Sequence, residues 1–105
     1  MYHSSALDLC AKGTQLCKFL MEEKNENLVS EKLFCSICEM SKYAYAMDNP
    51  SLSKADIAAF RKSISIEYYN VMFYLETIYN LGYISVAQKD SMIKTIDSLK
   101  KQINF

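Results

Sequence analysis

The sequence predicts an all-α protein that folds as an up-down-up-down four-helix bundle, and three observations support this fold class. First, the 105 residues include only two glycines and one proline, whereas a turn-rich all-β domain needs these residues at many corners. Second, four segments place apolar residues at steps of three and four, the spacing of one helix face. Third, two of these segments open with a serine capping box, at Ser53 and at Ser85. Half of the residues are apolar, so residues 1–105 are predicted to form a single domain around one core.

The first predicted helix covers approximately residues 5–22. Ser4 or Ser5 is predicted to cap it, because a serine hydroxyl accepts hydrogen bonds from the free N–H groups of a first turn. The polar stretch at residues 22–27 lacks a helical period and is predicted to hold the connection to the next helix. The apolar residues on one side of the helix are Ala6, Leu9, Cys10, Gly13, Leu16, Cys17, Leu20 and Met21.

The second predicted helix covers approximately residues 28–47. Pro50 marks its end, because a proline disfavours helical backbone in the residue before it, here Asn49. The predicted core face of this helix consists of Val29, Leu33, Ile37, Met40, Ala44 and Met47.

The third predicted helix covers approximately residues 54–81. Ser53 and Asp56 form the capping box at its start, and Gly82 suits the turn that ends it. At about 1.5 Å per residue the helix is predicted to be on the order of 40 Å long. Its predicted seam consists of Ile57, Phe60, Ile64, Tyr68, Val71, Leu75 and Ile78.

The fourth predicted helix covers approximately residues 86–103 and starts after the capping pattern Ser85–Gln88. Lys100 and Lys101 lie in its last turns, where cations interact favourably with the helix dipole. The apolar stripe of this helix consists of Met92, Ile93, Ile96, Leu99 and Ile103.

The third helix carries a second apolar face. At about 100° per residue, Ile66, Tyr69 and Phe73 lie roughly opposite the predicted seam. Aromatic residues on a face that a monomer core does not cover are typical of a protein–protein contact, so these three residues are the predicted oligomer interface. Homo-oligomerisation is the simplest form of this hypothesis. The alternative is a bundle that wraps the third helix more fully. The second helix has a similar apolar surplus, which comprises Phe34, Cys38 and Tyr45.

The four cysteines do not form a convincing reactive or metal site. Cys35 and Cys38 make a C-x-x-C motif, but it lies in mid-helix, whereas a redox pair usually stands at a helix N-terminus. Cys10 and Cys17 are about 10 Å apart along their helix, so a single zinc ion could hardly bind both. The cysteines are therefore predicted to be small buried hydrophobic residues, and a cysteine-dependent metal or redox protein is the weakest alternative.

Other catalytic arrangements also lack their residues. His3 is the only histidine, and it falls in a terminus predicted to be frayed. A di-metal bundle needs a Glu-x-x-His motif on two helices, and Ser-His or Cys-His catalysis needs a positioned histidine. The sequence also lacks a glycine-rich phosphate loop. We therefore predict no catalytic residues, no metal and no cofactor.

The charge distribution gives a weak indication of nucleic-acid binding. Twelve basic and twelve acidic residues cancel, which excludes a strongly basic arm. The one basic bias lies in the last helix, and a smaller group, Lys54, Arg61 and Lys62, begins the third. A ring of copies could present such lysines repeatedly and gain affinity through multivalency. A solvated charged face is the alternative. The candidate phosphate-binding residues are Lys89, Lys94, Lys100 and Lys101.

The chain start predicts the compartment. The residues Met1-Tyr2-His3-Ser4-Ser5 lack the basic region of a cleavable leader, and no apolar run approaches the roughly 18 residues of a membrane span. We therefore expect a cytoplasmic protein that does not enter a membrane, with its cysteines kept reduced.

Two stretches carry a family resemblance. Ser53-Lys-Ala-Asp-Ile-Ala-Ala-Phe60 and Leu81-Gly-Tyr-Ile-Ser85 resemble the small bacterial four-helix-bundle proteins first noticed in intervening sequences of large-subunit ribosomal RNA genes. That superfamily includes the accessory variability proteins of diversity-generating retroelements. The family pattern has a serine cap, an acidic residue, an aromatic residue, a long helix and then Leu-Gly-Tyr-Leu/Ile-Ser. This chain departs from the pattern at residues 41–48 and at Asn70, where a glutamate is common.

The resemblance implies a homo-oligomer, and specifically a pentameric ring. In the retroelement branch such a ring is an adaptor that binds reverse transcriptase and nucleic acid. The resemblance carries no catalytic residues across. The sequence hypothesis is therefore a non-enzymatic, self-associating scaffold or adaptor that binds RNA or DNA through the last helix. A protein-interaction module without nucleic acid is the alternative.

Overall fold

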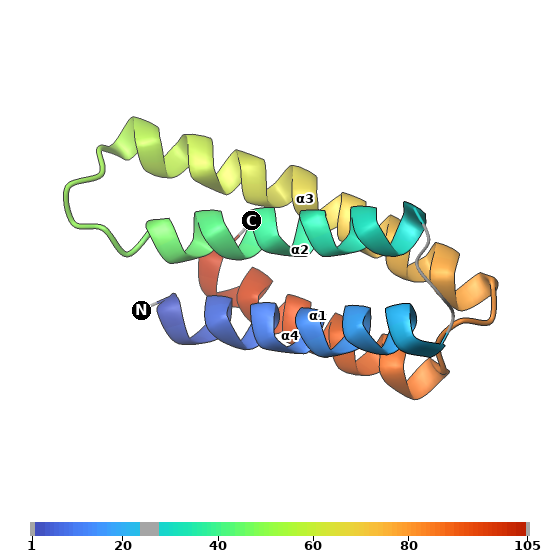
Figure 1. The fold of residues 1–105 in the computed structure, drawn as a ribbon. Coiled ribbons are helices and arrows are strands. Elements are labelled where there is room, and N and C mark those ends of the chain that lie inside the picture. The colour runs from blue at the N-terminus through green and yellow to red at the C-terminus, as the bar shows by residue number, and fades with distance from the viewer. Residues whose placement is uncertain (1, 24–27, 105) are drawn as a thin grey trace.

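The computed structural model describes residues 2–23 and 28–104, and within them the secondary structure is helical, without strands. The elements are α1 (His3–Glu23), α2 (Leu28–Ala46), α3 (Lys54–Asn80) and α4 (Val86–Ile103). Consecutive helices run in opposite directions (Figure 1), and α1 also packs on α4, which closes the bundle. The molecule measures 43 × 21 × 19 Å, so α3 extends along most of its length. The all-α four-helix prediction is confirmed. The largest difference between a predicted and an observed helix boundary is at the start of α1, which is predicted at residue 5 and lies at His3.

The apolar stripes of the four helices meet in one core. The large side chains that are fully buried come from every helix: Leu9, Leu20, Leu33, Ile37, Met40, Ile64, Val71, Leu75, Ile78, Ile96, Leu99 and Ile103. The helices α1 and α2 are in close contact at Gly13, where a Cβ atom would lie 2.7 Å from Cγ2 of Ile37. Met21 differs from the prediction, because it belongs to the α1 stripe and yet is 52% exposed.

Both serine capping boxes are present as the sequence predicts. At the start of α3, the Ser53 hydroxyl accepts from the Asp56 N–H at 3.1 Å, and the Asp56 carboxylate accepts from the Ser53 N–H at 3.1 Å. Ser85 and Gln88 make the equivalent exchange at the start of α4. Gly82 ends α3 with a φ of 78°, a left-handed conformation that glycine adopts without steric cost. The sequence therefore specifies both ends of the link from α3 to α4.

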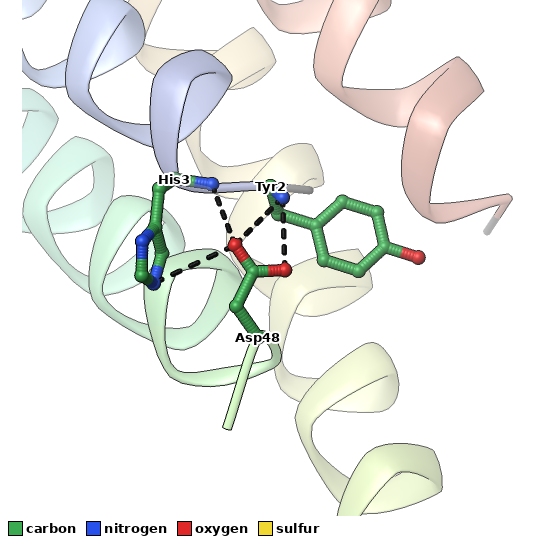
Figure 2. Close-up of polar contacts among 3 residues, drawn as sticks. All are labelled: Tyr2, His3 and Asp48. Atoms are coloured by element: carbon green, nitrogen blue, oxygen red, sulfur yellow. Dashed lines mark hydrogen bonds and ion pairs between the residues drawn. The ribbon is translucent and has the colours of Figure 1, made fainter. Parts of the chain in front are cut away.

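The start of α1 differs from the prediction. The helix begins at His3, and the carboxylate of Asp48, which follows α2, takes the place expected of Ser4 or Ser5 (Figure 2). Asp48 accepts from the Tyr2 N–H at 2.8 and 2.9 Å and from the His3 N–H at 2.9 Å. The His3 ring stacks on Tyr45, with centroids 4.0 Å apart, so the prediction of a frayed terminus is wrong. The cap comes from a residue distant in sequence, which a local pattern does not reveal.

Within residues 2–23 and 28–104, no helix is both long enough and apolar enough to span a membrane.

Candidate interaction surface

The outer side of α3 carries the three residues predicted as an interface, which we call the α3 ridge: Ile66, Tyr69 and Phe73. They are 54%, 69% and 67% exposed. The opposite side of the helix is fully buried at Ile64, Val71 and other seam residues, so the bundle does not wrap α3 as the alternative supposed. The structure thus places an apolar, largely aromatic strip in solvent, which is the surface that an interaction partner would cover.

Each aromatic ring of the α3 ridge packs against the ring of a neighbouring tyrosine. Tyr69 packs edge-on against Tyr68, with centroids 5.4 Å apart, and Phe73 packs edge-on against Tyr74 at 5.8 Å. Tyr68 and Tyr74 are themselves partly buried against the core. A side chain that is already restrained loses less rotamer freedom when it binds, so the ridge is prepared for contact.

A second apolar surface lies between α1 and α2. It is a cleft of about 640 Å³, beside the close contact at Gly13. Met21 and Phe34 contribute exposed apolar surface to this cleft, and the buried residue Cys17 also lines it. We call this site the α1/α2 cleft, and its lining residues are Thr14, Cys17, Lys18, Met21, Glu22, Ser30, Glu31, Phe34 and Cys35.

Sequence reasoning did not find the α1/α2 cleft, although two signals pointed to it. Phe34 belongs to the apolar surplus of the second helix, and Met21 is the last member of the first stripe. They come together only through the register of α1 against α2, in which Gly13 packs against Ile37. The other aromatic residue of the surplus on α2, Tyr45, lies near the other end of that helix and is stacked on His3 instead.

The four candidate lysines of α4 do not form one stripe. Lys89 and Lys100 are eleven residues apart, which places them within about 20° of each other around the helix. Lys94 and Lys101 form a second pair, about 120° away from the first. The structure therefore separates the predicted phosphate-binding residues into two faces.

The two lysine faces differ in their surroundings. Lys89 forms an ion pair with Glu76, and its ammonium lies 4.4 Å from the centroid of the Tyr79 ring. The hydrogen bond to Glu76 raises the pKa of Lys89. The Lys100 ammonium lies 4.6 Å from the Tyr68 ring centroid. These two side chains join α4 to α3, whereas Lys94 and Lys101 are exposed.

The smaller basic group at the start of α3 has a structural contact of its own. The Arg61 guanidinium donates from Nε to the backbone carbonyl of Ile103 at 3.2 Å. Arg61 therefore satisfies an acceptor at the end of α4, while Lys54 and Lys62 are exposed on α3.

The cysteines lie along the contact between α1 and α2. Cys17 is buried, as predicted, and Cys10 and Cys38 are half-buried, but Cys35 is exposed at the α1/α2 cleft, so the prediction is wrong for Cys35. Burial, together with the nearby thiols of Cys38 and Cys35, raises the pKa of Cys17 to about 12. Burial also raises the pKa of Cys38. These shifts disfavour the thiolate that nucleophilic, redox and metal chemistry requires.

Among residues 2–23 and 28–104, no three His, Cys, Asp or Glu side chains gather closely enough to hold a metal ion. His3 Nε2 lies 3.5 Å from Asp48, but that carboxylate is engaged by the backbone N–H groups of Tyr2 and His3. The arrangement is a helix cap with an adjacent imidazole.

No family model matches the chain, and no curated protein matches it. A solved structure does match: a protein of unknown function from the S23 ribosomal protein family of Bacteroides thetaiotaomicron, determined at 1.70 Å resolution. The TM-score is 0.88, and the match covers 98% of this chain and 94% of that protein. This chain has the same four-helix fold. The sequence identity is 19%, so the likeness concerns the fold alone.

Proposed function

We propose that this protein is a non-enzymatic scaffold that assembles with copies of itself through the α3 ridge. The observation that carries the proposal is the exposure of Ile66, Tyr69 and Phe73 on a helix whose other side is fully packed. Moving a whole large apolar side chain out of water contributes about 1.5–3 kcal/mol, so covering this strip favours association. The resemblance to the intervening-sequence and retroelement accessory proteins supports the same role and a pentameric ring.

The adaptor role extends this proposal to nucleic acid. The retroelement resemblance supports RNA or DNA, together with a reverse transcriptase, as the partners. Lys94 and Lys101 are the exposed pair on α4 that would contact phosphates. One copy offers few contacts, so the ring would supply the affinity by repetition. A cytoplasmic location fits the four cysteines, which are all unpaired thiols.

A competing function is a protein-interaction module without nucleic acid. The observation that favours it is the use of Lys89 and Lys100 in contacts with α3, which reduces the basic face to two exposed residues. Co-purifying nucleic acid distinguishes the two functions, because an adaptor carries absorbance at 260 nm in its protein peak.

Self-association is tested with the substitution Phe73→Glu. We expect the wild-type protein to elute in size-exclusion chromatography with light scattering at several times the monomer mass. The Phe73→Glu variant is expected to elute as a monomer with unchanged helical circular dichroism, because the substitution places a charge in the apolar contact. Leu7→Glu is the matched control, since Leu7 is 59% exposed on α1 and is expected to leave the mass unchanged. A wild-type protein that is monomeric at all accessible concentrations contradicts the proposal.

A further inference from the structure

The α1/α2 cleft and the α3 ridge are apolar surfaces of similar length. The cleft is recessed and apolar, and its α1 wall runs from Thr14 to Glu22. The ridge is exposed, and it runs from Ile66 to Phe73. The wall covers eight residue steps and the ridge seven, so the two surfaces are about 12 and 10 Å long. A helix that docks in a groove typically presents anchors at positions i, i+3 and i+7, which is the spacing of the α3 ridge.

Charges at the two surfaces also fit. Lys62 is exposed one turn before Ile66, on the same side of α3 as the ridge. Among the described residues that line the α1/α2 cleft, the charged ones are Glu22, Glu31 and Lys18. A ridge in the cleft would bring Lys62 towards the two carboxylates, which favours this pairing over contact with a basic surface.

We propose that the α1/α2 cleft receives the α3 ridge of a second copy of this chain. This inference rests on the proposed self-association and names the surface that the ridge contacts. A ridge-to-ridge dimer would leave Met21 and Phe34 in solvent, at 52% and 38% exposed, whereas ridge-into-cleft contact covers both surfaces at once. The contact is heterologous, because one copy contributes its ridge and the other copy contributes its cleft. Repeating it generates a ring when the rotation closes.

Mixing two disabled variants tests the proposal. Phe73→Glu removes the ridge and leaves the cleft, and Phe34→Glu removes the cleft and leaves the ridge. Each variant alone is expected to be monomeric. Mixed at high concentration, they are expected to form dimers and nothing larger, because one intact ridge meets one intact cleft. Two monomeric variants that fail to combine, while the wild type remains oligomeric, overturn the cleft assignment and leave the proposed self-association intact. A monomeric wild type overturns both.

A cross-link locates the contact directly, because Cys35 is an exposed thiol at the cleft. In the variant Tyr69→Cys, a mild oxidant is expected to join the introduced thiol to Cys35 of a neighbouring copy, two thiols giving up two protons and two electrons to the oxidant. Ile66 and Phe73 are unchanged in this variant, so two of the three ridge residues remain. We expect a ladder of cross-linked chains that disappears in Tyr69→Cys with Cys35→Ser. A ladder that persists without Cys35 places the ridge against another surface and overturns the proposal.

Discussion

At the scale of single residues, Asp48 shows how one side chain joins two distant parts of the chain. Its carboxylate accepts from the backbone N–H groups of Tyr2 and His3, at the start of α1. A negative charge at this position also interacts favourably with the helix dipole. The hydrogen bond from the Tyr2 N–H is the main cause that lowers the pKa of Asp48 from 3.8 to about 2. The end of α2 is thereby tied to the beginning of α1.

The lowered pKa predicts how stability depends on pH. A carboxyl whose pKa is depressed in the folded state stabilises the protein above its unfolded pKa of 3.8, and this contribution is lost as the pH falls towards 2. Asp48→Asn is expected to lower the thermal midpoint at pH 7 and to flatten the loss of stability between pH 4 and pH 2. Thermal unfolding across that range measures both effects.

Asp8→Asn is the matched control for Asp48→Asn. Asp8 is an exposed carboxylate on α1, 3.9 Å from Lys12, and its removal is expected to leave the acid profile nearly unchanged. Equal profiles for wild type and Asp48→Asn would contradict the assignment of the cap.

At the scale of helices, α1 and α2 depend on a glycine for their close contact. A Cβ atom on Gly13 would lie 2.7 Å from Cγ2 and 3.0 Å from Cδ1 of Ile37. Ile37 is fully buried, so its side chain has little room to move. The α1/α2 cleft lies beside the same contact.

This contact predicts that Gly13→Ala destabilises the protein, although alanine favours a helix by about 1 kcal/mol over glycine. We expect a loss of about 1–3 kcal/mol from overpacking, measured by urea unfolding. The double variant Gly13→Ala with Ile37→Ala is expected to cost less than the sum of the two single changes, because the new methyl group fills part of the cavity. A stabilising Gly13→Ala, or strict additivity, contradicts the close-contact explanation.

At the scale of the whole molecule, the bundle divides its lysines between structure and surface. Lys89 and Lys100 lie against α3 through Glu76, Tyr79 and Tyr68. Lys94 and Lys101 lie on another face of α4 and are exposed. If the assembly binds nucleic acid, the second pair provides contacts that every copy repeats.

Charge reversal separates these roles. Lys94→Glu with Lys101→Glu is expected to abolish binding of a fluorescent polynucleotide at moderate salt and to leave the fold intact. The milder Lys94→Gln with Lys101→Gln is expected to lower the slope of log affinity against log salt by about 2 per copy in contact. Lys89→Gln is expected to reduce stability with a smaller effect on binding. Unchanged binding and salt slope in the Lys94 and Lys101 variants would place any phosphate contacts elsewhere.

The sequence by itself determined the four helices, both serine capping boxes, the turn at Gly82 and the exposed α3 ridge. Each of these depends on residues within a few positions of one another, where the helical period and local hydrogen bonding decide the outcome. The tertiary structure alone decided the cap from Asp48, the partners of Lys89 and Lys100, and the α1/α2 cleft. Each of those features joins residues from separate elements. Their positions follow from helix register and close packing, which no single segment encodes.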